Sequence, residues 1–449
     1  MNVNPWIAAF SMSSRAADRF AQLERRALPA AVSNKVLDVD FEVIRAGMLG
    51  VFLCSERVMQ VMREVLAVGE GHAKLFYSAP REVVGSTYSS SPWGTTTLPA
   101  LMLTGLAGVG KSECLGALSR LLGECVGQVD LPGHKNLRHL PAWFMSLRES
   151  STVNAMLRPY IEVPGLINPD AAAGKAMQQS RLLELARRIS RRDGTCLTLV
   201  DELQFRTHSS PANALVTGLL LNLISLGPRL VYTCNFSLGH RLKSRRQEDR
   251  QRLLAHPIVL EPDPFDSPCF QKLLQEYFLV APDDFDLRAE QVAEEVHRYT
   301  FGIKRSVVNL LSLAWLSSKT KRGRTAKVVP DDLRAAYLSP RYLNFREDTE
   351  LLWRHTMGER QIREDLVNPF ESEVPEEKAK VVTANRAVQE YQRQVAQAHL
   401  DDLMTPAERA ALKDLQSPAD PMRSAKNKVV GLKRTKQSKE SMLDALDRL

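Results

Sequence analysis

Long apolar runs are missing from this chain of 449 residues, and no leader segment is expected. No stretch is apolar for long enough to span a bilayer; the nearest, 212–226, is interrupted by polar residues and is typical of a buried helix. Residues 1–10 show no basic region followed by a sustained apolar core, which argues against a secretory leader. We therefore expect a cytoplasmic protein that has no membrane partner.

Paired cysteines and metal-ligand clusters are missing as well. The chain has six cysteines, but none of them forms a C-x-x-C pair, so we expect reduced thiols. His134 and His139 have no companion ligands at zinc spacing, and no zinc site is predicted. The sequence also contains no internal repeat.

The composition is that of an ordinary globular protein, with 44% hydrophobic and 25% charged residues. The length predicts two or three domains. A formal net charge of +8 and a pI of about 9.1 favour a polyanionic partner such as DNA or RNA.

The clearest motif is the stretch from Gly105 to Ser112, which fits the phosphate-loop pattern G-x-x-x-x-G-K-[ST]. An apolar strand is expected before it, over 98–104, and a helix after it, over 112–122. The backbone N–H groups of such a loop and the helix N-terminus bind phosphate oxygens. Lys111 would reach the β- and γ-phosphates, and the Ser112 hydroxyl would complete a Mg²⁺ shell. The expected nucleotide-binding residues are Gly105, Gly108, Val109, Gly110, Lys111, Ser112 and Glu113.

Another apolar strand, expected over 196–201, ends in two adjacent acids, Asp201 and Glu202. In phosphate-loop ATPases the first acid of such a pair holds Mg²⁺ through its water shell. The second acid orients and deprotonates the attacking water. We therefore expect Asp201, together with Ser112, to hold the metal and Glu202 to act as the general base.

Further apolar segments complete a predicted five-stranded parallel sheet. The expected strands are 98–104, 141–147, 196–201, 230–234 and 257–260. Asn235 follows the fourth strand, where it would hydrogen-bond the attacking water or the γ-phosphate; a helix cap or turn is the alternative. A strand inserted between the phosphate-loop strand and the strand of the acids is the arrangement of the glutamate-assisted ATPases.

Basic residues gather between and after the predicted strands. The stretch 134–139 is expected to be a basic connection between elements. The stretch 240–252 is rich in arginine, and one of these arginines is a candidate finger for the ATP site of a neighbouring subunit. A solvated helix face is the alternative for this stretch. Residues 423–439 contain no acid and predict a flexible tail that contacts phosphates or an acidic partner, or a merely solubilising tail.

A group of small helices is expected after the sheet. Their predicted ranges are 269–278, 289–299, 305–317 and 330–337. Arg305 opens the third of these helices and is placed to report the γ-phosphate; its neighbour Lys304 is the alternative.

The motifs G-L-A-G-V-G-K-S, T-L-V-D-E-L-Q, Y-T-C-N, Q-E-D-R-Q-R-L-L and G-I-K-R together resemble those of an AAA+ ATPase. More narrowly, the chain is similar to the TnsC/TniB-type transposition regulators of heteromeric, TnsABC-like DNA transposons, over roughly residues 55 to 320. The resemblance implies ATP and Mg²⁺ as cofactors. It also implies ATP-dependent homo-oligomers on duplex DNA, either hexameric or heptameric rings or helical filaments. The implied protein partners are a target-selecting protein and transposase subunits.

The resemblance assigns roles residue by residue. Those that match the nucleotide-site motifs are Lys111 and Ser112, Asp201 and Glu202, the first sensor Asn235 and the second sensor Arg305. Either Arg252 or Arg250 matches the arginine finger. The DNA-facing residues that it suggests are Lys135, Arg138, Arg148, Ser151 and Thr152.

The expected fold class is α/β: an AAA+ (ASCE P-loop) five-stranded parallel sheet with helices on both faces, plus a small helical lid. The predicted domains are an N-terminal helical extension (1–54), the ATPase domain (55–262), the lid (263–338) and a partner-binding C-terminal extension with a basic tail (339–449).

The predicted function is that of an ATPase that assembles on DNA and recruits or activates a transposase. A helicase loader or replication initiator with the same ATPase core is the alternative. The inserted strand with Asn235, the basic finger region and the lid with Arg305 argue against a small-molecule kinase. An intact Glu202 argues against a scaffold that binds ATP without hydrolysing it.

Overall fold

The structure is a computed structural model of the full chain. It describes residues 4–11, 16–32, 36–79, 83, 98–131, 133–146, 152–161, 179–202, 210–357 and 363–370. Residues 1–370 form one compact unit, and a second unit, 371–449, lies outside the described residues together with the predicted basic tail.

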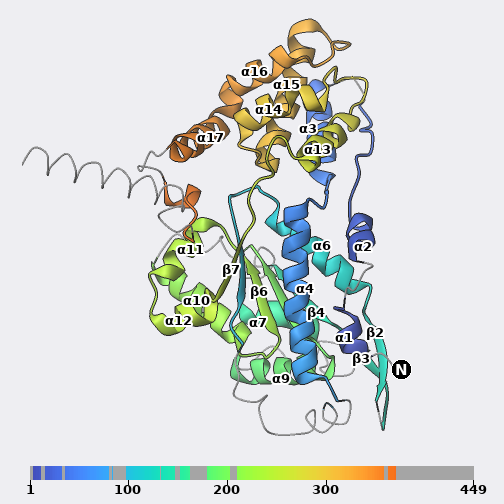
Figure 1. The fold of residues 1–449 in the computed structure, drawn as a ribbon, viewed down its shortest axis with the longest axis vertical. Helices are drawn as coiled ribbons and strands as arrows, with labels where there is room; N and C mark the ends of the chain where they lie inside the picture. The colour runs from blue at the N-terminus through green and yellow to red at the C-terminus, as the bar shows by residue number, and fades with distance from the viewer. Residues whose placement is uncertain are drawn as a thin grey trace, which may run out of the picture. The chain divides into compact units, whose positions relative to one another are not determined.

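Five parallel strands form the central sheet (Figure 1). They are β1 (Leu101–Thr104), β4 (Ala142–Ser146), β5 (Leu197–Asp201), β6 (Arg229–Thr233) and β7 (His256–Val259). Their spatial order is β4-β5-β6-β1-β7. The predicted five-stranded parallel sheet is therefore confirmed. The inserted strand is confirmed too, because β6 pairs with β1 on one side and with β5 on the other.

Helices cover both faces of the sheet, as the sequence predicts. One face packs against α4 (Glu56–Phe76) and α6 (Lys111–Gly123). The other packs against α7 (Val153–Ile161), α9 (Gln179–Arg192), α10 (Ser210–Ile224), α11 (Phe236–Lys243) and α12 (Gln247–Leu253). A parallel sheet buried on both faces needs apolar residues on each, and β1 shows this: Leu101 and Leu103 lie in the first cluster and Met102 in the second.

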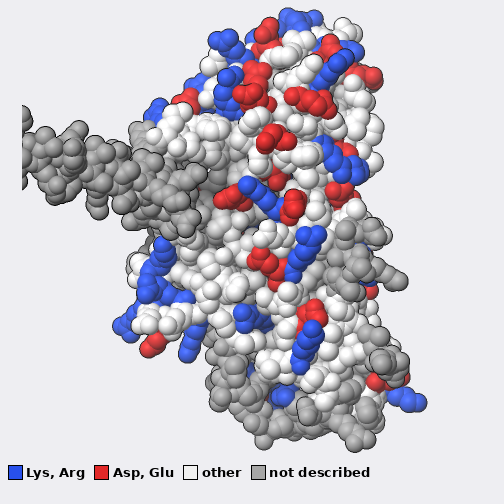
Figure 2. Space-filling view, viewed as in Figure 1, with Lys and Arg blue, Asp and Glu red and all other residues white. Residues whose placement is uncertain are grey.

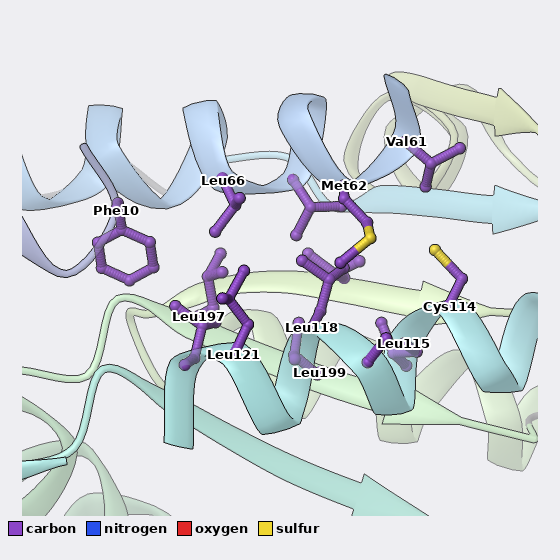
Figure 3. Packing of buried hydrophobic residues seen from close by; sticks show 14 of the residues in the cluster. Phe10, Val61, Met62, Leu66, Cys114, Leu115, Leu118, Leu121, Leu197 and Leu199 are labelled. Atoms are coloured by element: carbon purple, nitrogen blue, oxygen red, sulfur yellow. The ribbon is translucent and has the colours of Figure 1, made fainter. Parts of the chain in front are cut away.

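The first cluster holds the phosphate-loop helix in place (Figure 3). Met62 and Leu66 of α4 and Leu118 of α6 pack with Leu197 and Leu199 of β5. Each of these side chains is at most 2% exposed, and full burial of one leucine stabilises the fold by about 2 kcal/mol. Helix α4 runs to Phe76, because its apolar positions recur at helical spacing.

A two-stranded antiparallel hairpin follows α6, formed by β2 (Gly127–Leu131) and β3 (His134–His139). The expectation that 134–139 is a connection is therefore wrong. Pro132 and Gly133 separate the two strands in the sequence, and Gly133 has a φ of 82°. Proline followed by glycine is a turn signal, and it marks the hairpin once the flanking segments are considered as strands.

A second helical group follows the sheet in the chain. It contains α13 (Pro268–Leu279), α14 (Ala289–Thr300), α15 (Lys304–Arg322) and α16 (Pro330–Tyr337), which confirms the predicted helices. They surround a hydrophobic cluster of their own that includes Leu310 and Trp315, both fully buried. Helix α3 (Leu37–Gly50) also packs into this cluster, through Ile44 and Met48.

The chain before α3 runs beside both helical groups. It begins with α1 (Pro5–Ala8) and α2 (Ala16–Gln22). Arg25 then pairs with Phe52 in an isolated antiparallel bridge, and the Ala30 N–H donates to the Val280 carbonyl oxygen at 2.7 Å. This N-terminal stretch therefore contacts both the core around α4 and the end of α13.

The chain after α16 returns to the sheet domain. It forms η2 (Pro340–Tyr342), α17 (Leu343–Thr356) and η3 (Glu364–Leu366). Past η3, the Val367 carbonyl oxygen lies 2.9 Å from the ring nitrogen Nε2 of His240, a residue of α11. Leu366 packs with Leu106 of the phosphate loop and Ile303 at the start of α15. Among the described helices, none combines the length and apolarity required to cross a bilayer.

Candidate functional site: a phosphate-loop cavity

The predicted nucleotide residues meet at the carboxyl edge of the sheet. The phosphate loop follows β1, Asp201 ends β5, and Asn235 comes just after β6. These neighbouring strands border one cavity of about 500 Å³. Its polar and charged lining includes Lys111, Ser112, Glu113, Ser146, Asp201, Glu202, Thr233, Asn235, Lys304 and Arg305. Open parallel sheets bind ligands at this edge, and the cavity volume is within the range of small-molecule sites.

Glycine is required at two positions of the loop. A side chain at Gly105 would bring its Cβ within 2.4 Å of the Leu260 carbonyl oxygen, and the φ of Gly105 is 153°. A Cβ at Gly108 would lie 2.7 Å from the Cβ of Arg305, and its φ is 85°. The loop thus bends tightly and lets α15 approach its backbone. Val109 points the other way, into the hydrophobic cluster beside α6.

Lys111 is buried at the base of the cavity. Its side chain amine Nζ donates to the carbonyl oxygens of Gly105 and Leu106, each at 2.8 Å. Burial lowers the pKa of Lys111 from 10.5 to about 8, because the charged form is desolvated. A phosphate group beside this amine would favour its charged form.

Asp201 is held by two hydroxyl groups. Ser112 Oγ donates to Asp201 Oδ1 at 3.0 Å, and Thr233 Oγ1 donates to the same oxygen. A serine hydroxyl and a carboxylate this close are hard oxygen donors of the kind that bind Mg²⁺ together with substrate phosphates. The predicted metal-site residues therefore fit Mg²⁺.

Glu202 borders the same cavity from the end of β5. Its φ of 61° lies in the left-handed region, which is unusual for a residue other than glycine. The Glu202 backbone N–H donates to Thr233 Oγ1 at 3.2 Å. Thr233 thus contacts both acids, and sequence reasoning missed it because a lone threonine at a strand end carries no motif.

The two predicted sensor positions also line the cavity. Asn235 occupies the N-cap position of α11, but its side chain accepts no capping hydrogen bond from that helix as described. This favours the nucleotide-facing interpretation of Asn235 over the cap. The backbone N–H of Arg305 donates to the Gly108 carbonyl oxygen at 3.2 Å, which joins α15 to the phosphate loop. Lys304 and Arg305 both line the cavity, so the alternative between them stays open.

Part of the cavity wall is apolar. Three segments far apart in the sequence supply its lining: Val51, Phe52 and Leu53 before α4, Leu273 and Tyr277 of α13, and Val308 of α15. Burial raises the pKa of Tyr277 well above its usual value, so its hydroxyl stays protonated. No local sequence pattern connects these three segments, so the apolar wall could not be predicted from the sequence.

Two other predicted residues have partners within the chain. Glu113 forms an ion pair with Arg25, and both side chains are more than 40% exposed. Thr152 Oγ1 accepts the Ala155 N–H at 3.2 Å and so caps α7.

The candidate DNA and finger residues lie away from this cavity. Lys135 and Arg138 are on β3, and Arg138 Nη1 lies 3.8 Å from Asp193 Oδ2. Arg148 and Ser151 lie outside the described residues. Arg250 and Arg252 are exposed on α12, and neither lines the cavity of its own chain. Figure 2 shows Lys and Arg side chains gathered over α11 and α12, where the basic residues are Arg241, Lys243, Arg245, Arg246, Arg250 and Arg252.

No protein-family model and no curated protein sequence matches this chain. It is similar to the Orc1 protein of Aeropyrum pernix, solved in complex with DNA, at 16% identity over 66% of this chain and 79% of that chain, with a TM-score of 0.36. It is similar to a Walker-type ATPase of Pyrococcus abyssi at 15% identity over 68% of this chain and 87% of that chain, with a TM-score of 0.36. It is also similar to AMPPCP-bound DnaA of Aquifex aeolicus at 13% identity over 77% and 95% of the two chains, with a TM-score of 0.31. Because these sequence identities and TM-scores are low, the function is inferred from the strand order and the site geometry of the chain itself.

Proposed function

We propose that this chain is a cytoplasmic ATP-hydrolysing regulator of the AAA+ type that assembles on duplex DNA and links target-site selection to transposase recruitment. The observation that carries the ATPase part is the convergence of Lys111, Asp201, Glu202 and Asn235 on one cavity. The transposition part rests on the sequence resemblance to TnsC/TniB-type regulators.

The site residues divide the chemistry among them. Lys111 and the loop backbone bind the β- and γ-phosphates, and Ser112 and Asp201 hold Mg²⁺. The metal, when bound, offsets the charge that develops on the phosphate oxygens. Glu202 orients the attacking water and accepts its proton, and Asn235 hydrogen-bonds that water or the γ-phosphate. The apolar wall around Tyr277 receives the adenine ring of ATP.

Assembly would complete the site. Arg250 and Arg252 are exposed on α12 and lie outside the cavity of their own chain. An arginine supplied by a neighbouring subunit stabilises the transition state of phosphoryl transfer, by a factor of about 10³ or more in the best-studied cases. Hydrolysis would then depend on the oligomer, whether ring or filament.

DNA would be bound through its phosphates. Lys135 on the hairpin is exposed and is a candidate contact. Arg138 is half-buried, and its approach to Asp193 leaves it less available. Binding of this kind weakens steeply as salt rises.

The test uses Glu202→Gln, which keeps the size of the side chain and removes its basicity. Purified variant, duplex DNA and MgATP are examined by electron microscopy, and ATP turnover is measured in parallel. We expect turnover to fall by about 10²-fold or more, because the general base is lost, while oligomers on DNA persist. Lys111→Ala is the control that should prevent nucleotide-dependent assembly. Unchanged turnover in Glu202→Gln, or a protein that stays monomeric with every nucleotide and DNA, would refute the proposal.

The partner decides between transposition and the alternative of a replication initiator or helicase loader. Both alternatives use the same ATPase site, so turnover does not separate them. Binding is therefore compared between a transposase encoded by an adjacent gene and a replicative helicase. ATP-dependent binding of the helicase alone would favour the alternative.

A further inference from the structure

The hydroxyl group of Thr233 lies between the two acids of the cavity. We propose that Thr233 is a positioning residue that holds Asp201 and Glu202 in the arrangement that nucleotide hydrolysis requires. This inference rests on the ATPase function proposed above and adds a residue to it.

The hydrogen bonds of Thr233 have a fixed direction. Thr233 Oγ1 donates its one hydrogen to Asp201 Oδ1. The same oxygen accepts the backbone N–H of Glu202 at 3.2 Å. Thr233 is 1% exposed, so water does not substitute for either partner at low cost. A single hydroxyl therefore fixes the carboxylate of one acid and the backbone of the other.

The sheet order explains why a residue so distant in the sequence reaches both acids. β6 pairs with β5 in parallel register, with Tyr232 opposite Val200. The next residue on each strand is then Thr233 and Asp201, side by side at the carboxyl edge. Because this register is fixed by the buried residues of both strands, Thr233 is a rigid support.

Ser112 shares only the first part of this role. Ser112 Oγ also donates to Asp201 Oδ1, at 3.0 Å, and a lone pair of the same oxygen is a candidate metal ligand. Ser112 would therefore orient Asp201 from the phosphate-loop helix, with or without a metal ion. Thr233 orients the same carboxylate from the neighbouring strand and also holds the backbone of Glu202.

The backbone of Glu202 needs support of its own. Its φ of 61° is a conformation that is unfavourable for a residue with a side chain, and such conformations persist only where neighbours enforce them. The hydrogen bond from the Glu202 N–H to Thr233 is one such contact. It determines where the Glu202 side chain leaves the backbone, and hence where the base meets the water.

The experiment compares Thr233→Val with Thr233→Ser. Valine keeps the shape and removes the hydroxyl, whereas serine keeps the hydroxyl. The control is Thr198→Val: Thr198 lies on β5, is fully buried, does not line the cavity, and its hydroxyl has no hydrogen-bond partner among the described residues. Folding of each variant is checked by thermal melting, and Thr233→Ala serves if Thr233→Val does not fold.

Two quantities are measured for each variant. The first is kcat for ATP hydrolysis, which we expect to fall by about 10- to 100-fold in Thr233→Val and Thr233→Ala, since a small misplacement of catalytic groups has effects of this size. The second is the affinity for a fluorescent ATP analogue with and without Mg²⁺. We expect Mg²⁺-free affinity to stay within about threefold and the gain in affinity with Mg²⁺ to shrink, because Asp201 is misoriented. Thr233→Ser and Thr198→Val should behave like the wild type in both measurements.

The possible results separate this inference from the proposed function. Equal behaviour of Thr233→Val and Thr198→Val would overturn the inference and leave the ATPase proposal intact. Loss of Mg²⁺-free nucleotide binding in Thr233→Val would also overturn it, because it indicates general damage to the site. A wild-type protein that binds MgATP without hydrolysing it would overturn the proposed function and the role of Thr233 toward Glu202. The contact with Asp201 would then be supported or overturned by the affinity measurements.

Discussion

If the proposed function holds, the buried amine of Lys111 should make nucleotide binding depend on pH. In the nucleotide-free protein burial lowers the pKa of Lys111 to about 8. Phosphate oxygens beside the amine favour its protonated form, so the pKa rises when ATP binds. Binding to the deprotonated protein must therefore include the uptake of one proton, and affinity must fall as the pH rises above the pKa of the free protein.

The size of the effect follows from the fraction of protein that carries the proton. With a pKa of about 8, about nine tenths of Lys111 is protonated near pH 7 and about one tenth near pH 9. The dissociation constant for ATP should therefore increase about tenfold over this interval, which corresponds to about 1.4 kcal/mol. The loss should approach tenfold for each further pH unit until the pKa of the bound state is reached.

The measurement is a titration with a fluorescent ATP analogue at fixed Mg²⁺ and ionic strength. Lys111→Arg is the matched control, because a guanidinium keeps its charge throughout this range. We expect the variant to bind more weakly at every pH but with a flat profile. An affinity of the wild type that does not change between about pH 7 and pH 9 would refute the reasoning, and so would an equal decline in Lys111→Arg.

Further predictions concern the arginine finger, the second sensor and the packing of η3. Arg252→Ala should lose most ATP turnover and regain part of it when mixed with Glu202→Gln subunits, which assemble without hydrolysing ATP and bring an intact finger; Arg250→Ala should keep turnover within about threefold. Arg305→Ala should lower turnover by about tenfold or more, measured under saturating ATP, because the variant loses a guanidinium group that lines the cavity and that would stabilise the γ-phosphate. Leu366→Ala should lower the free energy of unfolding by about 3 kcal/mol, measured by denaturant titration, because its side chain is 9% exposed and packs between α11 and the start of α15.

Each of these predictions would be contradicted by a particular result. Rescue of Arg250→Ala instead of Arg252→Ala would identify Arg250 as the finger, and no rescue of either would exclude a finger from α12. A larger loss in Lys304→Ala than in Arg305→Ala would assign the second sensor to Lys304. For Leu366, the control is Leu338→Ala, a leucine that is 58% exposed and should cost no more than about 0.5 kcal/mol. Equal effects at the two leucines would show that the contact of η3 with the core contributes little.

Much of the nucleotide site could be predicted from the sequence, because phosphate chemistry imposes local constraints. A loop that wraps a phosphate needs glycines at fixed spacing, followed by Lys111 and Ser112 at the start of a helix. The acids Asp201 and Glu202 could be recognised because they end a run of buried residues. The strands themselves could be found because a sheet covered on both faces requires continuous apolar segments.

Secondary structure is harder to predict from the sequence where one pattern is compatible with two structures. The polar stretch 134–139 alternates too weakly to indicate a strand, and only pairing with 127–131 makes it one. The sequence after residue 339 likewise shows only a weak secondary-structure pattern, which does not predict α17 and η3. Their packing depends on a few apolar contacts, such as Leu352 and Leu366.

By itself, the sequence determined which residues are candidates for binding a nucleotide, since a phosphate ligand sets the identity and spacing of the residues in such a motif. Only the tertiary structure decided which side chains support them. Thr233 reaches Asp201 because two strands lie side by side, and the apolar wall forms because three distant segments meet. Such contacts depend on strand register and helix packing, which are properties of the whole buried core and leave no mark on any short stretch of chain.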